Sequence, residues 1–502
     1  MTALPVSLVN LGDVVDALGK RVVRLVGDRS LPVSGLSQDS RRVLAGEIFA
    51  ARTGKAQSGL KYLDAALARG AVALLVEAGN VTRELQIPVV EVDDIEGAIA
   101  AGAEAAFGFP SKKLQTIGIT GTNGKTTSTW LVQQALVGAG KMCASLGTLG
   151  FNFQGVSEDT GLTTPEADAI CRFEKEALTR GATHFAMEVS SHALVQQRVE
   201  GKHFSVAAFT NLTQDHLDFH GSMESYFLAK ARLFTDFGVE VSVIHTEHEW
   251  GKRLARMATG RVLSIGDGAG ANVKVRQFEL GPRGLSATVS FPSGLVDLVA
   301  PLTGKHNLEN CLTALSVVEA LGLDVRAAAT ALQNMPQVPG RMERCDAPED
   351  DIAVIVDYAH TPDALCRALS ASRELTSGRL ICVFGCGGDR DAAKRPLMGE
   401  SVRALADFAF ITNDNPRSES PQQIARAIEA AFAGDAARYS VVLDRSCAIS
   451  DAILGAAPGD VVVIAGKGHE SYQIIGSVRS DFDDRAEAKR ALSTRRAARR
   501  QS

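Results

Sequence analysis

Short apolar runs alternate with segments of helical period along most of the chain. In the first part of the sequence, this pattern predicts strands at 71–76 and 89–92 and helices at 62–68 and 95–107. Strands that alternate with helices in this way indicate an α/β domain of modest size.

The alternation continues in two further segments. The second contains strand-like runs at 117–120, 182–189, 204–212 and 240–245 and helix-like runs at 130–137, 307–321 and 325–334. The third contains strand-like runs at 352–356, 380–384, 408–412, 440–443 and 461–465 and a helix-like run at 362–373. We expect a mainly parallel sheet with helical crossovers in the second segment and a doubly wound sheet in the third.

Two stretches depart from this pattern. Residues 272–302 alternate apolar and polar positions and are split by Pro/Gly turns, so we expect an antiparallel meander added to the sheet of the second segment. Residues 495–502 carry four arginines among small residues, and we expect a frayed, solvated end.

Turns that contain proline or glycine indicate the expected domain boundaries. A polar turn at 110–113 closes the first segment, and Pro336 and Pro339-Gly340 close the second. The sequence therefore predicts domains at 1–111, 112–339 and 340–502, and a length of 502 residues suits about three domains.

Composition excludes several classes of protein. The formal net charge of −5 disfavours binding to nucleic acid through bulk charge. The eight cysteines form no C-x-x-C pair, which disfavours a zinc site and is typical of a reducing compartment. The N-terminus lacks the pattern of a signal peptide, and no apolar run approaches the ~20 residues of a membrane span. We expect a cytoplasmic protein.

The strongest chemical signal is the stretch 114–127, which reads LQTIGITGTNGKTT. A buried strand leads into the glycine turn 121–127, and a helix follows. This order is typical of a phosphate-binding loop, in which backbone N–H groups and the helix N-terminus face the phosphates. Lys125 would reach the β- and γ-phosphates and Thr126 would bind Mg²⁺. Ile119 replaces the first glycine of the strict G-x-x-x-x-G-K-[ST] pattern, yet the context predicts a nucleoside triphosphate site.

A second cluster lies at the following strand ends. It comprises Glu188, His192, Asn211 and the run 215–220, which reads DHLDFH. Carboxylate and imidazole groups beside a phosphate loop are candidate Mg²⁺ ligands. Lys230 lies in a helix-like run, where a lone lysine is normally solvated.

A third cluster lies in loops of the last segment, at 388–390, 394–396, 414–417 and 466–470. Arginines at strand ends form bidentate clamps for carboxylates, and Glu470 with Asp414 could hold an ammonium group. This cluster indicates a site for a small amino acid with more than one carboxylate. Arg390 replaces the third glycine of a dinucleotide fingerprint that would start at Gly385, so we reject that interpretation.

Seven motifs together resemble one family. They are GTNGKTT at 121–127, EVSSH at 188–192, TNLTQDHLDFHG at 210–221, GKHNLEN at 304–310, PGRME at 339–343, DYAHTPDAL at 357–365 and AGKGHE at 465–470. In order, and over nearly the whole chain, they resemble the Mur ligase family of peptidoglycan synthesis. The resemblance implies an N-terminal α/β UDP-binding domain, a central ATP-binding domain with a P-loop and a C-terminal Rossmann-like domain that binds an amino acid.

Within the family, the chain most resembles ligases that add the third residue to UDP-N-acetylmuramoyl-L-alanyl-D-glutamate. The DNPR box at 414–417 resembles the form that adds meso-diaminopimelate rather than L-lysine. The resemblance implies that ATP and Mg²⁺ are used and that the acyl group is activated as an acyl phosphate. We expect a monomer without a nucleic-acid partner or a membrane span.

The resemblance also assigns residues to roles. For ATP it implies Gly121, Thr122, Asn123, Gly124, Lys125, Thr126, Thr127, Asn307, Arg341, Asp357 and His360. For the metal and catalysis it implies Thr126, Glu188, His216, Lys125 and Lys230, the last as a carbamate. For the UDP-muramoyl-dipeptide it implies Ser40, Thr163, Thr164, Ser190, Gln196 and Arg198. For diaminopimelate it implies Arg390, Asp414, Asn415, Pro416, Arg417, Gly466 and Glu470.

Some positions depart from the family pattern. Lys55, Ala56, Gln57 and Leu162 stand where relatives often show other polar residues. One alternative is a folylpolyglutamate synthetase, which resembles the same family, although the DNPR box and the first domain count against it. Another is a regulatory P-loop NTPase that binds partners, in which Glu470, Arg390 and Arg417 would have no task.

Overall fold

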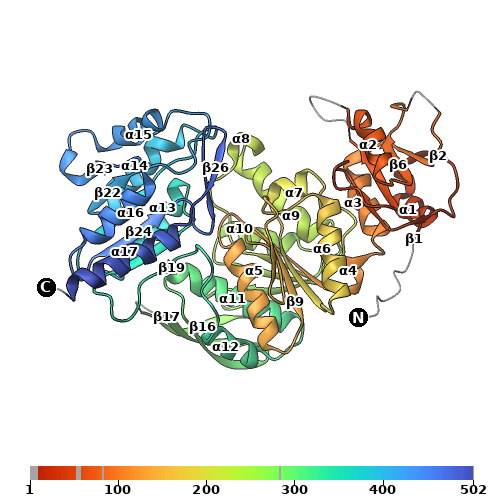
Figure 1. The fold of residues 1–502 in the computed structure, drawn as a ribbon. Coiled ribbons are helices and arrows are strands. Elements are labelled where there is room, and N and C mark those ends of the chain that lie inside the picture. The colour runs from red at the N-terminus through yellow and green to blue at the C-terminus, as the bar shows by residue number, and fades with distance from the viewer. Residues whose placement is uncertain (1–8, 53–57, 82–83, 282–283, 501–502) are drawn as a thin grey trace. The chain divides into compact units, whose positions relative to one another are not determined.

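The structure, a computed structural model, describes residues 9–52, 58–81, 84–281 and 284–500 (Figure 1). It divides into two compact units. The first comprises Met1–Gln277, Ala287–Leu298 and Glu309–Leu332, and the second comprises Phe278–Ser286, Val299–Leu308 and Gln333–Ser502. In the described ranges no helix is long and apolar enough to cross a membrane.

The first unit begins with a five-stranded sheet of order β2-β7-β6-β5-β4. These strands are β2 Val22–Val26, β4 Gly35–Ser37, β5 Glu47–Ala51, β6 Ala73–Glu77 and β7 Val89–Val92, and β1 Val9–Asn10 pairs separately with β3 Pro32–Val33. Only β2 runs antiparallel to its neighbour in the sheet. One core lies between the sheet and helices α1 Leu11–Leu18 and α3 Ile95–Ala106, and a second lies under α2 Leu63–Ala68. The predicted strand at 89–92 is confirmed to the residue.

The same unit contains an eight-stranded sheet of order β11-β10-β9-β12-β8-β13-β14-β15. Its strands are β8 Gln115–Thr120, β9 Cys143–Gly147, β10 Gly150–Phe153, β11 Val156–Glu158, β12 His184–Glu188, β13 Val206–Phe209, β14 Val241–His245 and β15 Arg261–Ile265. All neighbours from β9 to β15 are parallel, as predicted. The register pairs Ile119 with Glu188 and Thr120 with Phe209, so the residues after three strands meet at one edge.

Helices surround this sheet and bury an apolar core against it. They are α4 Pro110–Lys113, α5 Lys125–Gly138, α6 Ala167–Thr179, α7 Ser191–Val195, α8 Leu217–His220, α9 Met223–Thr235 and α10 Glu249–Met257. Two further helices, α11 Lys305–Ala320 and α12 Val325–Gln333, match the predicted helical runs.

The predicted addition of a meander to the eight-stranded sheet is wrong. Strands β16 Lys274–Gly281, β17 Gly284–Phe291 and β18 Gly294–Ala300 form a three-stranded sheet of their own. In β17 every second residue is buried, whereas the inner strands β9, β12, β13 and β14 of the eight-stranded sheet are buried throughout. A sheet with one solvated face forms a separate layer, because polar side chains on that face could not continue a sheet covered by helices on both faces.

The second unit contains a six-stranded sheet of order β19-β20-β24-β21-β22-β23. These strands are β19 Glu343–Arg344, β20 Ala353–Asp357, β21 Leu380–Phe384, β22 Phe408–Ile411, β23 Tyr439–Val441 and β24 Val461–Ala465, and the pair β25 Tyr472–Ile475 and β26 Val478–Asp481 stands apart. Helices α13 Pro362–Arg373, α14 Lys394–Leu405 and α15 Pro421–Glu429 bury one core, and α16 Arg445–Leu454 and α17 Asp484–Arg499 bury another. The doubly wound prediction is confirmed, and β24 lies between β20 and β21.

The predicted frayed end is wrong over its described part. Helix α17 runs to Arg499, and its residues Ala488 and Leu492 belong to an apolar core. Arg495 pairs with Asp351 at 2.9 Å, and Arg496 lies 3.0 Å from Asp350. Ion pairs with these carboxylates hold Arg495 and Arg496 in place. The carboxylates lie about 145 positions earlier in the chain, so no local pattern predicts the pairs.

Candidate active site

The glycine turn after β8 has the shape that the sequence predicts. Gly121 has φ +149° and Gly124 has φ +84°, and α5 begins at Lys125, five residues before the predicted helical run. A Cβ on Gly121 would lie 1.9 Å from Thr210 Oγ1, so only glycine fits there. The turn therefore presents backbone N–H groups at the N-terminus of a 14-residue helix, a ready anion site.

Residues after β13 hold this turn in place. The Asn123 N–H donates to Asn211 Oδ1 at 3.0 Å, and Asn211 Nδ2 donates to the Asn123 carbonyl at 3.1 Å. Thr210 Oγ1 donates to the same carbonyl at 2.6 Å. The loop is thus shaped before any phosphate arrives. Lys125 folds over it, and its Nζ donates to the carbonyls of Gly121 at 3.0 Å and Thr122 at 2.8 Å.

The predicted metal residues Thr126 and Glu188 lie together. Thr126 Oγ1 donates to Glu188 Oε2 at 3.1 Å, and the Thr148 N–H donates to Glu188 Oε1 at 2.7 Å. Glu188 is buried at the end of β12. A buried carboxylate beside a hydroxyl offers the oxygen donors that Mg²⁺ prefers, so these residues fit the ion. Thr148 was missed, and its place after the buried strand 143–147 is the signal that could have found it.

Lys230 is not a solvated helical lysine, contrary to what its sequence context alone suggests. Its side chain is buried in α9, and its Nζ donates to the Gly121 carbonyl at 2.8 Å and lies 4.5 Å from the centre of the Tyr226 ring. Burial, followed by the charge of Lys125, lowers the pKa of Lys230 well below its usual value, and Asp215 opposes this shift. Lys230 therefore belongs to the phosphate loop region, where the resemblance had placed it.

His216 lies in the same neighbourhood. It adopts φ +53°, its Nε2 lies 3.5 Å from Asp215 Oδ2, and its ring packs against His192 with centres 4.8 Å apart. Burial lowers the pKa of His216, and burial together with His216 lowers the pKa of His192 to about 4. Both imidazoles are therefore neutral near pH 7, the form that can donate a lone pair to a metal.

Four residues expected at the dipeptide arm are linked around Glu188. Thr164 Oγ1 donates to the Glu188 carbonyl at 2.9 Å and accepts from the Ser190 N–H at 3.0 Å. Arg198 Nη1 donates to the Thr164 carbonyl at 2.7 Å. Thr163 Oγ1 lies 3.1 Å from Thr148 Oγ1.

Two further residues, Gln196 and Ser40, were expected at the UDP-muramoyl-dipeptide, and Leu162 was noted as a departure from the family pattern. Gln196 caps the C-terminal end of α7, and Ser40 lies partly exposed after β4. Leu162 is exposed. Lys55, Ala56 and Gln57 lie outside the described residues.

The remaining nucleotide residues belong to the second unit. The Arg341 guanidinium stacks on the Tyr358 ring at 4.3 Å, and Asp357 accepts from the backbone N–H groups of Met342 at 2.7 Å and Ala359 at 2.8 Å. Burial raises the pKa of Asp357, and the charge of Arg341 opposes the rise.

Two other residues of this set make backbone contacts. His360 Nδ1 lies 2.8 Å from the Tyr358 carbonyl, and burial lowers the pKa of its imidazole. Asn307 Nδ2 donates to the Thr303 carbonyl at 2.8 Å.

The expected amino-acid residues converge on a lysine that the sequence did not single out. Lys467 Nζ lies 3.2 Å from Asn415 Oδ1, 3.2 Å from Glu470 Oε2 and 3.7 Å from Asp414 Oδ1. Asn415 Nδ2 donates to Glu470 Oε2 at 3.0 Å. Lys467 is fully buried, although a lysine in a glycine-rich loop is normally solvated. The signal that could have found it is its place in the 466–470 loop, which contains Glu470 and was expected to lie near Asp414 of the 414–417 box.

Arg417 and Arg390 lie beside this cluster. Arg417 has φ +52°, and its Nη1 donates to the Gly388 carbonyl at 2.8 Å. Gly388 approaches so closely that a Cβ would lie 1.8 Å from the Pro416 carbonyl oxygen. Arg390 is exposed, and its Nη1 donates to the Asp389 carbonyl at 3.3 Å. The loop after β21 thus lies against the Asp414–Arg417 segment.

Family models match the segments that carry these clusters. The Mur ligase middle domain matches residues 119–318, and the Mur ligase, glutamate ligase domain matches residues 340–468. The UDP-N-acetylmuramoyl-L-alanyl-D-glutamate–2,6-diaminopimelate ligase of Gloeobacter violaceus is 45% identical over 474 residues, 93% of this chain and 96% of that protein. The chain belongs to the Mur ligase family.

Other relatives agree with this assignment. The protein of the same name from Geobacter metallireducens is 41% identical over 93% of this chain and 95% of its own length. A solved structure of such a ligase has a TM-score of 0.68, is 32% identical and covers 97% of this chain and 99% of its own. The folylpolyglutamate synthase of Mycobacterium tuberculosis shares the fold, with a TM-score of 0.61, 19% identity and coverage of 72% of this chain and 90% of its own. The predicted family and fold class are confirmed.

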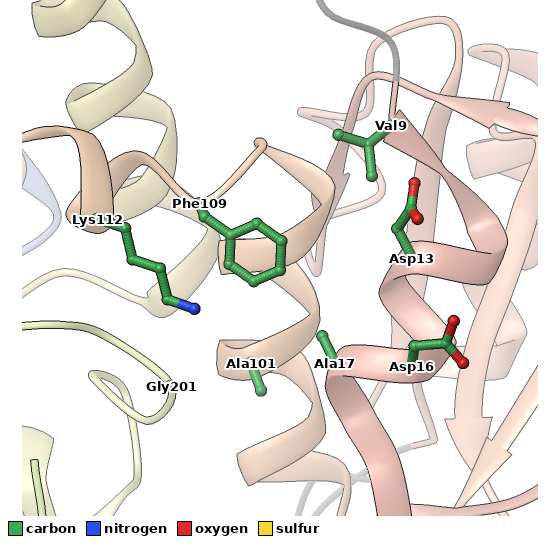
Figure 2. Close-up of a pocket in the computed structure, with 8 residues that line it drawn as sticks. All are labelled: Val9, Asp13, Asp16, Ala17, Ala101, Phe109, Lys112 and Gly201. Atoms are coloured by element: carbon green, nitrogen blue, oxygen red, sulfur yellow. The ribbon is translucent and has the colours of Figure 1, made fainter.

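This Mur ligase also has a groove of about 500 Å³ that none of the expected site residues lines. Figure 2 shows Asp13 and Asp16 of α1 on one side and Phe109 and Lys112 on the other, with Ala101 of α3 between them.

Proposed function

We propose that this Mur ligase adds meso-diaminopimelate to UDP-N-acetylmuramoyl-L-alanyl-D-glutamate in the cytoplasm, with conversion of ATP to ADP and phosphate. The observation that carries the proposal is the name shared by relatives that are 41–45% identical to more than nine-tenths of the chain. The arrangement of the two loop clusters supports it, because one suits a nucleotide and the other a zwitterion with an extra carboxylate.

The first unit would activate the carboxylate. A free carboxylate is a poor acyl donor, since its leaving group would be oxide. Transfer of the γ-phosphoryl group to a carboxylate oxygen of the glutamyl residue gives an acyl phosphate and ADP. Lys125 would stabilise the charge on the transferring group once its ammonium leaves the carbonyls of its own loop.

Magnesium would bind at Thr126 and Glu188, with His216 and carbamylated Lys230 as further ligands. When bound, it supplies positive charge beside the phosphates. The protein itself contributes a preformed site, because Thr148 and Thr164 hold the Glu188 side chain and main chain in place.

The second unit would supply the nucleophile. The amine of diaminopimelate attacks the acyl carbon, phosphate leaves with the former carboxylate oxygen, and the nitrogen loses a proton to complete the amide. Asp414 and Glu470 suit an ammonium group. Lys467 Nζ would hold both carboxylates in place, because it lies 3.7 Å from Asp414 Oδ1 and 3.2 Å from Glu470 Oε2. Arg417 suits the carboxylate that distinguishes diaminopimelate from lysine.

A mass measurement tests the proposal. The full chain is incubated with ATP, Mg²⁺, the UDP-muramoyl-dipeptide and one amino acid at a time, and the product is weighed. We expect the mass of the diaminopimelate adduct together with ADP. A lysine adduct, or ATP hydrolysis without any adduct, would contradict it.

Arg417 provides the specificity test. Leaving a guanidinium without its carboxylate costs roughly 3–5 kcal/mol when the group is buried, so we expect discrimination against lysine of about 100-fold or more. Arg417→Ala should lose most kcat/KM for diaminopimelate while that for lysine stays low. Arg417→Lys should also be poor, because a point charge does not reproduce the fork. An unchanged ratio of the two kcat/KM values in Arg417→Ala would refute the role.

A further inference from the structure

A buried ion pair joins the starts of two helices beside the amino-acid cluster. Arg445 is the first residue of α16 and Asp484 is the first of α17, and neither side chain is exposed. Arg445 Nε lies 2.7 Å from Asp484 Oδ1, and Nη2 lies 2.7 Å from Oδ2, which makes the pair bidentate.

The rest of the guanidinium reaches two backbone carbonyls. Arg445 Nη1 donates to the Asn413 carbonyl at 3.2 Å, and Nη2 donates to the Ala465 carbonyl at 3.0 Å. These residues immediately precede Asp414 and Gly466, two residues expected to bind diaminopimelate. Asn413 follows β22 and Ala465 is the last residue of β24, and these two strands are separated in the sheet by β21. One planar group therefore links the carboxyl ends of two strands that are not neighbours in the sheet.

The spacing of these loops is tight. Gly466 has φ +119°, and a Cβ there would lie 3.0 Å from Asp414 Oδ2. A small movement of either loop would change the position of the Asp414 carboxylate relative to the Gly466 backbone, and misplacement by about 1 Å can cost on the order of 100-fold.

We infer that Arg445, held by Asp484, is a positioning residue that sets the spacing of the Asp414 and Gly466 loops and so the affinity for the amino-acid substrate. This inference rests on the proposed function for the identity of that substrate. Stability alone does not account for the pair, because apolar residues of similar volume often replace a buried ion pair without loss of stability.

The second unit offers a matched control on the same helix. Arg495 of α17 forms a bidentate pair with Asp351, with two N–O distances of 2.9 Å. Its Nη1 donates to the carbonyls of Ile453 at 3.0 Å and Leu454 at 3.3 Å. The bidentate geometry is the same, with Arg499 Nη1 as a second partner of Asp351 at 3.1 Å, and neither carbonyl adjoins an expected site residue.

The experiment compares Arg445→Met/Asp484→Leu with Arg495→Met/Asp351→Leu in the full chain. For each, Tm, kcat and the KM values for ATP, the UDP-substrate and the amino acid are measured. In the first variant we expect the amino-acid KM to rise roughly 10- to 100-fold, while Tm and the ATP KM stay near those of the wild type. The control should change none of the KM values.

An unchanged amino-acid KM in the first variant, or an equal rise in both variants, would overturn the inference. If the first variant does not fold, Arg445→Lys decides, because an ammonium keeps a charge beside Asp484 but cannot reach both carbonyls. A raised amino-acid KM then supports the positioning role, and an unchanged KM refutes it. The KM is measured for whichever amino acid the mass assay shows to be ligated. Ligation of an amino acid other than diaminopimelate refutes the proposed function, whereas the KM comparison still tests the positioning role with that amino acid.

Discussion

Two buried lysines of the first unit, Lys202 and Lys230, have opposite surroundings. Lys202 Nζ lies 2.9 Å from Glu104 Oε2 and 2.5 Å from Glu174 Oε2. Lys230 Nζ instead faces the Gly121 carbonyl, and no ion pair among the described residues involves it. Both side chains are almost completely removed from solvent.

The two pKa values move in opposite directions. Burial disfavours the charge of Lys202, but Cys171 and then Glu104 and Glu174 outweigh it and raise the pKa of Lys202 well above its usual value. For Lys230, burial lowers the pKa and Lys125 lowers it further. Burial alone therefore says little about a lysine, and its neighbours decide between a fixed cation and a reactive amine.

The regions around the two lysines have different tasks in the fold. Lys202 joins Glu104 of α3 to Glu174 of α6, and Glu104 in turn accepts a hydrogen bond from Ser111 Oγ of α4 at 2.5 Å. Next to it, Gly201 lies so close to α3 that a Cβ would be 3.0 Å from Ala101 Cα, at the groove of Figure 2. Lys230 Nζ instead donates to the Gly121 carbonyl of the phosphate loop and links no pair of helices through carboxylates.

The largest expected effect is on stability at Lys202. Lys202→Ala leaves two buried carboxylates without a cation, which costs roughly 3–5 kcal/mol. We expect a marked fall in the Tm of the first unit, measured by thermal denaturation. The kcat of the folded protein should change little. Lys175→Ala is the control, because Lys175 donates only to the Phe107 carbonyl, at 3.3 Å. If Lys202→Ala and Lys175→Ala have the same Tm, Lys202 does not stabilise the first unit as a fixed cation.

Lys125→Ala tests the charge that faces Lys230. Removing one electrostatic contact to the transferring group costs about 3–4 kcal/mol in the transition state. We expect ligation to be nearly abolished while the variant stays folded, because Lys125 Nζ donates to the Gly121 and Thr122 carbonyls of its own loop and does not bridge to a distant carboxylate through these bonds. Near-normal turnover in the folded variant would refute the assignment of the phosphate loop.

Lys230→Ala tests whether the reactive amine is carbamylated. We expect kcat to fall on the order of 100-fold or more and Tm to stay the same or rise, because a buried group without a carboxylate partner is removed. Short carboxylates such as formate should restore part of the activity, and native mass spectrometry of the wild type should show added CO₂. Absence of both rescue and adduct would refute the carbamate, and Lys202→Ala should show no rescue.

The smallest effect concerns pH. Glu174 faces Lys202, Glu104 and Cys171, and burial raises its pKa from 4.5 to about 7, against the charge of Lys202. Between these values the folded protein keeps a proton that the unfolded chain has released, so the stability contributed by Glu174 falls as pH rises from about 4.5 to about 7. The difference in Tm between wild type and Glu174→Gln should therefore fall over that range. A difference that does not depend on pH would count against a shared charge in this cluster.

Local sequence patterns were enough to predict many of the elements and the shape of the glycine loop. The helix at 362–373 and the strands at 380–384 and 461–465 match the predicted bounds, because apolar period and flanking turns are local properties. The glycine loop follows equally from local backbone demands. The two boundaries between the three domains and the roles of the site residues stay predictions.

Which polar groups meet depends on the tertiary structure. Thr148 against Glu188, Lys467 between Asn415 and Glu470, and Arg445 between two loops all join residues that are distant in sequence or whose burial no local pattern shows. The docked Arg495 was missed for the same reason. A local pattern records the preference of each segment, whereas burial of a charge depends on partners that parallel strands and their crossovers bring together from across the chain.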